Sequence, residues 1–459
     1  MAEILGPNGV VQADSPLPIL IVGSGSTGLA LAQGLRKHMS LCHGLFQQHP
    51  NPADVLFVNY TSSFCLAFVA PICGLQRLLS GEKAGIKCVV FEKQPEQARE
   101  RDWNMGLHWG ALVLKTLMPD EWWSRIQSLQ VDPHVPTKDE DTLAFIHGTT
   151  GERMNAFTFG PFYRLRRSKL RELLSQDLEV QCSKHLSDIT YAEDGNSVTA
   201  HFADGTSATG KMLVGADGAR SSTRRCLLGS EAGAIHRIPY AATFVQMRFT
   251  KEQALYLRSF HPLYLATAHP GNYFAFFGMH DAVDPNDPSS WVFFFYISWH
   301  SSLEEQDATA NWTDAQRLAQ QKDFAKTFCD PWKSAYEWTP DDAPVWHLGL
   351  TDWDPGFEGH RWDNHAGLVT MVGDAVHPMT YQRGQGLNHS ITDAGKLRDT
   401  IVRINEGGDR KQLVTEFEEE MIARGGDEVR TGTANTILLH NWEKVMQSPF
   451  FQKGLKKNH

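Results

Sequence analysis

The chain has 459 residues, of which 41% are hydrophobic and 21% are charged, and its formal net charge is −10. This length exceeds what a single hydrophobic core usually absorbs, so we expect two closely packed domains. Lys and Arg are scattered along the acidic chain, which argues against binding to nucleic acid or to an anionic membrane surface. The composition is otherwise that of an ordinary globular protein.

The seven cysteines form neither a CxxC pair nor a spacing typical of metal ligands, so the sequence predicts no metal site. Their odd number in a long chain argues against a disulfide scaffold and for a reducing compartment. Residues 1–18 lack the basic start and the apolar core of a signal peptide. We therefore expect a cytoplasmic location.

The first element is the apolar run at residues 18–22, which is typical of a strand buried on both faces. It leads directly into Gly23, Gly25 and Gly28 of a GxGxxG motif, followed by a helical pattern over residues 29–35. Glycines at these positions permit a tight turn and the close approach of a pyrophosphate, and the helix N-terminus supplies amide donors. Strand, glycine turn and helix together predict a dinucleotide-binding site.

Such a site needs an acidic residue at the end of the second strand to bind a ribose. Residues 86–92 have the pattern of that strand, and Glu92 ends it. However, Glu92 lies 64 residues after Gly28, where about 20 are expected. Removing residues 38–83 would leave a spacing of 18 and an ordinary helix-to-strand turn. We therefore interpret residues 38–83 as an insertion.

This insertion contains an uncharged apolar stretch at residues 55–75, long enough to span a bilayer. Three interpretations stay open: an added surface element, a membrane-inserting hairpin, or translated non-coding sequence retained in the predicted gene. We favour the third. The membrane interpretation is the weakest, because a single span there would split a cofactor domain across a bilayer. Membrane association is expected only if the apolar stretch is genuine.

The middle of the chain predicts a helix and then an antiparallel meander. Residues 164–176 have a helical pattern with leucines on one side. Residues 186–192, 197–202 and 207–214 have the pattern of strands joined by Asp-Gly turns, which are strong hairpin signals.

The chain changes character from about residue 236 to 350, where aromatic β-runs such as residues 272–277 and 291–299 appear. They predict a strand-rich second domain, and we interpret most of these aromatic side chains as sheet core. Beyond residue 367 the pattern of the first domain returns, and the chain ends in helices.

Two more motifs accompany the GxGxxG. Residues 212–221 form a strand pattern that ends in Asp217-Gly218, and residues 372–379 (VGDAVHPM) precede a GQGLN segment that opens a helix. With all three motifs in this order, the sequence resembles the class A flavoprotein monooxygenases, the p-hydroxybenzoate hydroxylase superfamily. The resemblance covers nearly the whole chain outside residues 38–83. The residues around the motifs are similar to those of a branch common in fungal secondary metabolism.

The resemblance implies an α/β fold with a Rossmann-type, GR2-like FAD-binding domain, a second domain with a mixed β-sheet for the substrate, and C-terminal helices. The expected FAD-binding domain comprises residues 16–110, 160–230 and 361–400, the substrate domain residues 111–159 and 231–360, and the C-terminal helices residues 401–459.

The resemblance also implies roles in binding FAD. Glu92 would bind the adenosine ribose and Asp374 the ribityl chain, since carboxylates accept hydrogen bonds from hydroxyl groups. Arg167 would neutralise the pyrophosphate, and the GQGLN helix start would face the flavin pyrimidine edge. His377 is expected to be structural rather than an acid or base. The full set of implied cofactor-binding residues is Gly23, Gly25, Gly28, Glu92, Arg101, Gly106, Arg167, Asp217, Gly218, Asp374, Pro378, Gly384, Gly386, Leu387 and Asn388.

In the family's chemistry NADPH or NADH reduces FAD, and dioxygen forms a flavin hydroperoxide that passes oxygen to the substrate. The resemblance therefore implies hydroxylation or epoxidation of a small aromatic, indolic or prenylated metabolite, with no catalytic side chain required. Halogenases of the same fold carry a Trp-x-Trp-x-Ile-Pro segment, which this sequence lacks. Two alternatives stay open: a flavin-dependent oxidoreductase without oxygen insertion, and a non-catalytic product disabled by the insertion.

Overall fold

The computed structural model describes residues 16–48, 86–96, 102–449 and 451. The expected insertion lies mostly outside these residues, although the first helix continues past residue 38 to Gln48. The apolar stretch at 55–75 and Arg101 also lie outside the described residues.

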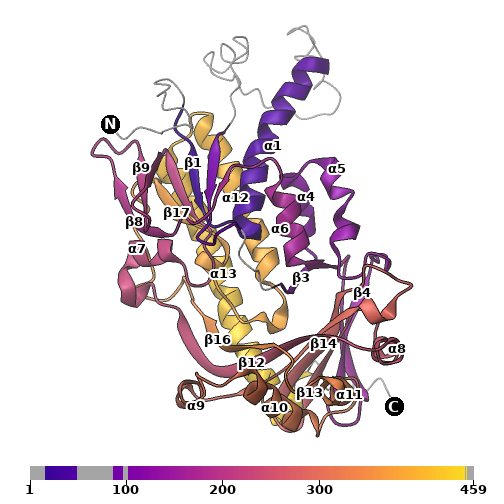
Figure 1. Cartoon of the computed structure of the whole chain (residues 1–459). Coiled ribbons are helices and arrows are strands. Elements are labelled where there is room, and N and C mark those ends of the chain that lie inside the picture. Colours follow the sequence, from indigo (N-terminus) through magenta and orange to yellow (C-terminus); the bar gives the residue numbers. More distant parts are fainter. Residues whose placement is uncertain (1–15, 49–85, 97–101, 450, 452–459) are drawn as a thin grey trace.

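Five strands form the first sheet, in the upper half of Figure 1, in the order β17-β11-β1-β2-β7. Every neighbouring pair is parallel. The strands β1 and β11 are apolar throughout because other layers cover both faces of the sheet. The strands are β1 (Ile19–Val22), β2 (Cys88–Phe91), β7 (Val180–Gln181), β11 (Met212–Gly215) and β17 (Val369–Met371).

Helices from several parts of the chain share one core with this sheet. α1 packs against α12, α4 and α6. The helices within residues 111–129 contribute to this core, although the sequence analysis placed them in the substrate domain. The helices of this layer are α1 (Ser26–Gln48), α4 (Ala111–Leu117), α5 (Asp120–Trp123), η1 (Ile126–Leu129), α6 (Arg167–Ser175) and α12 (Gly386–Asn405).

A three-stranded antiparallel sheet, β10-β9-β8, covers the opposite face. Its Val198 and Phe202 share a core with Leu20 and Phe91 of the first sheet. The predicted meander is therefore confirmed. Its elements are β8 (Leu186–Tyr191), β9 (Val198–Phe202) and β10 (Ser207–Gly210), and α7 (Ser222–Ala232) follows β11.

Two expected elements are each split in the structure. The strand predicted at 207–214 divides at Lys211 into β10, which pairs with β9, and β11, which joins the parallel sheet. The helix predicted at 164–176 starts only after strand β6 (Tyr163–Arg166), which pairs with β3 (Asn104–Leu107). In both cases pairing with a distant strand overrides a pattern that is continuous in the local sequence.

The second sheet has seven strands in the order β16-β12-β15-β14-β13-β4-β5, in the lower half of Figure 1. The expected mixed sheet is confirmed, because β13 and β4 are parallel whereas the other pairs are antiparallel. The aromatic runs form β14 and β15. The strands are β4 (Asp141–His147), β5 (Arg153–Phe159), β12 (His236–Arg248), β13 (Tyr264–His269), β14 (Tyr273–Asp281), β15 (Val292–His300) and β16 (Val345–Asp352).

The two faces of the second sheet have separate cores. We call the face that carries Phe244, Phe276, Phe294 and Tyr296 the inner face; its core includes Leu439 near the C-terminus. Helices pack on the opposite, outer face. These helices are α8 (Lys251–Phe260), α10 (Asp314–Ala325) and α11 (Trp332–Trp338).

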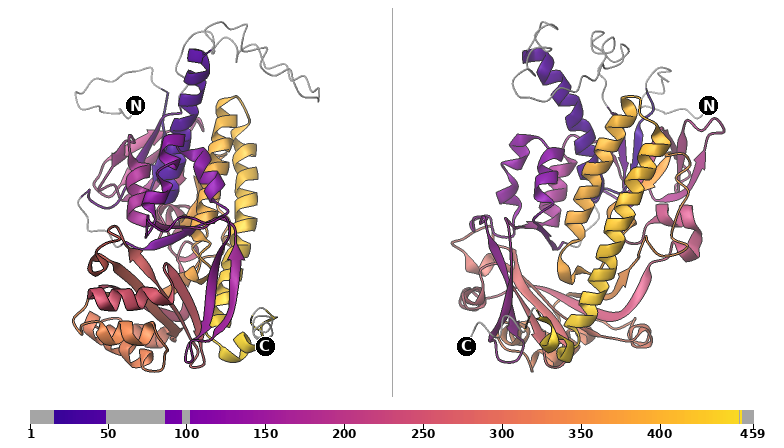
Figure 2. Two further views of the ribbon diagram at one scale, coloured as in Figure 1. Left: turned by 90° about the vertical axis from the view of Figure 1, so that its right-hand side faces the viewer. Right: turned by 180° about the vertical axis from the view of Figure 1, so that it is seen from behind.

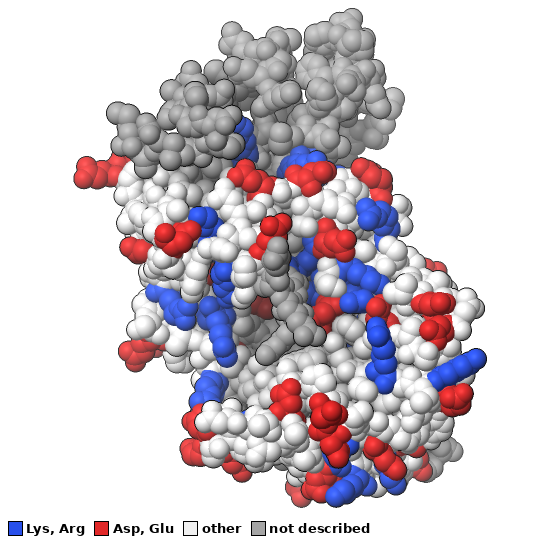
Figure 3. Space-filling view, viewed as in Figure 1, with Lys and Arg blue, Asp and Glu red and all other residues white. Residues whose placement is uncertain are grey.

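The β3–β6 ribbon and a long helix connect the two halves of the molecule. Figure 2 shows α13 (Arg410–Leu439, yellow) extending from the first sheet to the second, where α14 (Trp442–Gln447) follows. Within the described residues, no helix combines the length and apolarity needed to cross a membrane. Basic and acidic side chains are interspersed over the face shown in Figure 3.

Candidate active site

The sequence motifs meet at one edge of the parallel sheet. Gly23, Glu92, Asp217 and Asp374 follow β1, β2, β11 and β17 by one to three residues. Because these strands are parallel, their carboxyl ends lie along the same edge. In open α/β sheets this edge is where ligands bind, so it is the candidate active site.

The glycine turn after β1 combines tight packing with open space. Gly23 has a φ of 112°, and a Cβ there would lie 2.2 Å from the carbonyl oxygen of Ala216. A Cβ on Gly28 would lie 2.2 Å from the carbonyl oxygen of Gly23. A Cβ on Gly25 would meet nothing within 4 Å. Gly25 directly precedes α1, so a phosphate group can approach the backbone amides at that helix start.

Glu92 is held as a charged acceptor at the end of β2. Its Oε2 accepts hydrogen bonds from the amide of Ser24 at 3.1 Å and from the Ser24 hydroxyl at 2.7 Å, and its Oε1 accepts one from the amide of Gln94 at 2.9 Å. Burial disfavours the charge, but these hydrogen bonds and the nearby Arg171 hold the pKa of Glu92 below its usual value. A charged carboxylate here can accept further hydrogen bonds from hydroxyl groups.

Helix α6 brings two arginines to the same edge. The guanidinium of Arg167 lies 4.4 Å from the ring centroid of Trp103, and burial lowers the pKa of Arg167. Arg171, one turn later, donates from Nε to the carbonyl oxygen of Ser24 at 2.8 Å and from a terminal nitrogen to the Ser24 hydroxyl at 2.9 Å. The two side chains provide positive charge beside the glycine turn.

The carboxylate of Asp217 accepts its hydrogen bonds from the start of the following helix, α7. Its Oδ2 accepts hydrogen bonds from the amides of Ser222 at 2.7 Å and Thr223 at 3.0 Å, and its Oδ1 accepts one from the Ser221 hydroxyl at 2.5 Å. These contacts cap the N-terminus of α7. Gly218 follows with a φ of 79°, which favours glycine. Asp217 therefore shapes the loop after β11.

The turn after β17, which contains Gly373 and Asp374, lies against the first turn of α1 and the second turn of α12. Gly373 has a φ of 61°, and a Cβ there would lie 2.7 Å from Thr27 Oγ1 and 3.0 Å from Ser390 Oγ. The side chain of Asp374 is accessible, although the surrounding protein desolvates its carboxyl group enough to raise its pKa. This turn therefore places an accessible carboxyl group beside the N-terminal halves of two helices.

A buried charge network supports the same turn. Asp393 Oδ2 accepts hydrogen bonds from His377 Nε2 at 2.6 Å and from the amide of Gly373 at 2.8 Å, and Asp393 Oδ1 accepts one from Arg424 at 2.7 Å. Arg424 also donates to Glu420 at 2.9 Å. Burial opposes the charge on His377, but Asp393 outweighs it and raises the pKa of His377. These contacts are consistent with a structural His377.

Asn388 joins the start of α12 to the segment after β3. Its Oδ1 accepts hydrogen bonds from the amides of His108 at 3.0 Å and Gly110 at 3.1 Å. Its Nδ2 donates to the carbonyl oxygens of Gly106 at 3.2 Å and Gly384 at 3.4 Å. The side chain is fully buried. Asn388 and Gly106, which were both predicted as site residues, are thus brought together.

The remaining predicted residues lie around this helix start. Gly384 has a φ of 64°, and a Cβ on Gly384 or on Gly386 would meet nothing within 4 Å. A ligand can therefore approach the amides at the N-terminus of α12. Leu387 is half-buried against the first core. Pro378 is buried, and its carbonyl oxygen accepts a hydrogen bond from the amide of Trp353 at 3.1 Å.

Tyr381 connects this edge to the inner face of the second sheet. It belongs to the short helix η4 (Tyr381–Arg383), just before Gly384. Its ring centroid lies 5.3 Å from that of Tyr296 and 5.5 Å from that of Phe244. The candidate site therefore borders the aromatic core on the inner face of the second sheet.

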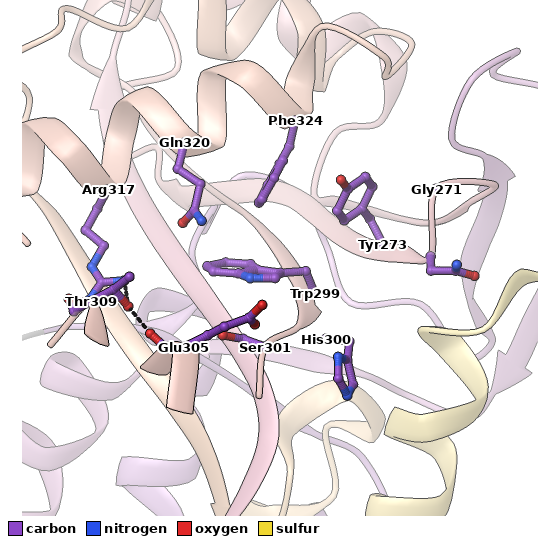
Figure 4. A pocket seen from close by; sticks show the side chains of 11 residues that line it. Gly271, Tyr273, Trp299, His300, Ser301, Glu305, Thr309, Arg317, Gln320 and Phe324 are labelled. Atoms are coloured by element: carbon purple, nitrogen blue, oxygen red, sulfur yellow. Dashed lines mark hydrogen bonds between the residues drawn. The ribbon is translucent and has the colours of Figure 1, made fainter. Parts of the chain in front are cut away.

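A cavity of about 460 Å³ lies elsewhere, between the ends of β14 and β15 and helices α9 (Leu303–Ala308) and α10. Figure 4 shows Trp299, Arg317 and Phe324 around it. None of its lining residues belongs to the three motifs. This cavity is therefore distinct from the candidate active site.

Sequence reasoning missed several residues that organise the site. Arg171 could have been found, because it lies one helical turn after Arg167 and so shares its face. Ser24 occupies a variable position of the glycine motif, so the motif itself predicts no role for it. Asp393 and Arg424 carry no local signal, since each acts on a turn that is distant in the sequence.

Comparison with known proteins agrees with this geometry. A family model described as an FAD binding domain matches residues 357–431, which include the turn after β17 and the start of α12. The FAD-dependent monooxygenase cctM from Talaromyces islandicus is 32% identical over 442 residues, covering 96% of this chain and 97% of the relative. The FAD-dependent monooxygenase phnB from Penicillium herquei is 33% identical over 390 residues, covering 84% and 93%.

Solved structures share the fold. HpxO from Klebsiella pneumoniae, in complex with FAD and uric acid, has a TM-score of 0.65 at 16% identity, covering 95% of this chain and 92% of that chain. The 2,6-dihydroxypyridine-3-hydroxylase from Arthrobacter nicotinovorans has a TM-score of 0.64 at 14% identity, covering 94% of each chain. With relatives above 30% identity over most of both chains, this chain belongs to the FAD-dependent monooxygenases of the class A, p-hydroxybenzoate hydroxylase-like type.

Proposed function

We propose that this enzyme uses NADPH or NADH and dioxygen to hydroxylate or epoxidise a small aromatic metabolite, with FAD bound along the carboxyl edge of the first sheet. The observation that carries the proposal is that the N-terminal halves of α1 and α12 both pack against Gly373, where a Cβ would lie within 3.0 Å of both Thr27 and Ser390. Two helix N-termini at one edge favour an extended anionic cofactor. When bound, FAD supplies electron transfer from the nicotinamide and the activation of dioxygen.

The residues beside α1 fit the adenosine diphosphate half of FAD. The open space at Gly25 accommodates a phosphate, and Arg167 and Arg171 offset its charge. The charged carboxylate of Glu92 is suited to accept hydrogen bonds from two ribose hydroxyl groups.

The residues beside α12 fit the flavin half. The accessible carboxyl group of Asp374 is suited to the ribityl hydroxyl groups. The open backbone at Gly384 and Gly386 leaves the amides of the α12 N-terminus facing the ring, where they would stabilise negative charge on the pyrimidine edge. Asn388 and Pro378 then act mainly as positioning residues, because their polar contacts are made within the fold.

We assign the substrate to the inner face of the second sheet, where Tyr381 links the flavin side to Tyr296 and Phe244. Aromatic side chains exclude water from a reacting centre and pack well against a planar ring. We include the helices of residues 111–129 in the FAD-binding half, because they share one core with the first sheet.

The first test is the visible absorption spectrum of the purified full chain, beside a version that lacks residues 38–83. A flavin spectrum in the full chain is the expected result. If only the shortened chain binds FAD, the insertion disables this product. If neither version binds added FAD, the proposal is wrong.

A second measurement separates oxygen insertion from simple flavin reduction. The holoenzyme is supplied with NADPH or NADH, ¹⁸O₂ and a panel of hydroxylated naphthalenes, and products are analysed by mass spectrometry. One ¹⁸O atom per product molecule is the expected result. Nicotinamide oxidation with no labelled product from any panel member supports the alternative of an oxidoreductase without oxygen insertion.

A further inference from the structure

Arg164 lies at the boundary between the two halves of the candidate site. It pairs with Gly106 in the β3–β6 ribbon, and the carbonyl oxygen of Gly106 accepts a hydrogen bond from Asn388 at the start of α12. Its guanidinium lies 4.6 Å from the ring centroid of Phe276 and 5.8 Å from that of Tyr264. Arg164 therefore lies between the flavin-binding edge and the inner face of the second sheet.

The charge of Arg164 is buried and has no acidic partner. Arg164 is 8% exposed, and its Nε makes no hydrogen bond. In the part of the chain that the structure describes, no Asp or Glu forms an ion pair with it. Burial lowers the pKa of Arg164 to about 10, so the side chain stays protonated at neutral pH. The two aromatic rings offset only part of the cost of burying this charge.

Arg166, on the same face of β6, differs from Arg164 because acidic side chains pair with its charge. Arg166 lies two residues further along β6, so its side chain points to the same side of the strand. Its terminal nitrogens lie 2.8 Å from Asp102 Oδ2 and 2.5 Å from Asp281 Oδ2. Acidic residues of the protein therefore neutralise the charge of Arg166, whereas the charge of Arg164 is available to pair with a bound anion.

The surroundings of Arg164 suit an aromatic ligand. Tyr296, on the inner face, is 5% exposed, and its ring lies 5.9 Å from Phe276 in a stacked arrangement. The Tyr264 hydroxyl donates to Asp141 at 2.7 Å, so it is already engaged. Burial raises the pKa of both tyrosines above the usual range, so both remain neutral. Arg164 is thus a cation among neutral aromatic rings, and the acidic group nearby, Asp141, is engaged by the Tyr264 hydroxyl.

We propose that Arg164 is a specificity-determining residue that binds an oxyanion on the aromatic substrate, either a phenolate or a ring carboxylate. This inference rests on the proposed function, because it assigns the substrate to the inner face. Pairing with Arg164 would stabilise the anion and fix the orientation of the ring beside the flavin. For a phenol, binding as the phenolate also enriches the ring in electrons, which favours attack on an electrophilic oxygen.

The test measures binding of three probes to the full-length holoenzyme by perturbation of the flavin absorption spectrum. The probes are 2-naphthol, 2-naphthoate and the neutral 2-methoxynaphthalene. We expect at least one of the two acidic probes to bind about tenfold or more tightly than the neutral probe. Preference for 2-naphthol identifies a phenolate, and preference for 2-naphthoate identifies a carboxylate.

The variants Arg164→Met and Arg164→Lys connect this preference to the residue. Arg164→Met should lose about tenfold or more in affinity for the acidic probe but less than threefold for the neutral one, and Arg164→Lys should recover part of the loss. Arg237→Gln is the control, since Arg237 is on β12 of the second sheet, pairs with Asp307 and is half exposed. It should leave all three affinities unchanged.

The melting temperatures of the variants show whether a loss of binding reflects a loss of folding. Arg164→Met removes an unpaired buried charge, so its melting temperature without aromatic ligand should not fall. Arg166→Met removes the guanidinium that Asp102 and Asp281 share, and it should lower the melting temperature. Equal binding of acidic and neutral probes, no binding of either acidic probe, or unchanged selectivity in Arg164→Met overturns the proposal. Loss of FAD rather than of probe selectivity in Arg164→Met also overturns it, by assigning the charge to the cofactor. The failure of the proposed function is separate, since it appears as absent FAD binding in the unmodified chain.

Discussion

The imidazole of His377 and the carboxylate of Asp393 form a fully buried pair, with His377 Nε2 2.6 Å from Asp393 Oδ2. The two residues lie on different elements: His377 follows the turn after β17, and Asp393 is on α12. Asp393 also accepts the amide hydrogen bond of Gly373. The pair therefore determines how the turn that contains Gly373 and Asp374 is placed against α12.

Replacing Asp393 by asparagine should destabilise the protein strongly. Asp393→Asn keeps the shape but removes the charge that His377 and Arg424 both face. Removing one partner of a buried ion pair costs about 3–5 kcal/mol, so we expect a loss of that order in the free energy of unfolding in urea. Asp399→Asn, an exposed neighbour of Arg398 on the same helix, should change it by less than about 1 kcal/mol. A similar small change in Asp393→Asn would contradict this role.

The same pair predicts how stability depends on pH. The pKa of His377 is raised in the folded state, so folding stabilises its protonated form. That contribution is fully present below the unfolded pKa of about 6.5 and is lost as the pH rises through the higher folded value. The free energy of unfolding should therefore decrease above pH 6.5 in the native protein and decrease less in His377→Gln. Parallel pH profiles for the two proteins, measured by urea unfolding between pH 6 and 9, would remove this explanation.

The parts of the site that follow buried strands could be predicted from the sequence. Glu92 directly follows the apolar run of β2, and Asp374 follows β17 by three residues. In a parallel sheet, position after a strand is enough to place a residue at the binding edge. The aromatic runs of β14 and β15 were likewise predictable, because burial on a two-sided sheet requires them.

Other features depend on contacts that no local pattern contains. Residues 164–166 continue the helical pattern of α6, yet they pair with β3, about 60 residues earlier, and form a strand. The pairing of β6 with β3 also fixes where the arginines of β6 lie. Arg166 then meets Asp102 and Asp281, whereas Arg164 meets no acidic partner among the described residues. Asp393 lies in an ordinary helical sequence, and only the packing of α12 against the turn at Gly373 reveals its role.

The glycines of the first motif should separate folding from cofactor binding. A Cβ on Gly25 meets nothing within 4 Å, so Gly25→Ala should leave the unfolding free energy of the cofactor-free protein within about 1 kcal/mol of the native value. The added methyl group would occupy the space proposed for a phosphate, so the Kd for FAD should increase about tenfold or more. Gly28→Ala places a methyl group 2.2 Å from a backbone oxygen and should destabilise the fold itself. FAD titration by fluorescence quenching and thermal unfolding together check both statements; equal FAD affinity in Gly25→Ala would disprove the assignment of the phosphate.

Asn388 should act on the cofactor through the backbone that it holds. Asn388→Ala leaves the amides of His108 and Gly110 without their acceptor, at a cost of about 1–3 kcal/mol for each buried donor. Loosening the start of α12 against Gly106 should also weaken flavin binding and increase unproductive nicotinamide oxidation, measured as hydrogen peroxide formed per NADPH consumed. Asn405→Ala, at the exposed end of the same helix, removes only an acceptor for Lys211. It should change neither the affinity for FAD nor the amount of peroxide formed. If Asn388→Ala lowers stability but leaves FAD affinity and peroxide formation unchanged, Asn388 supports the fold without positioning the cofactor.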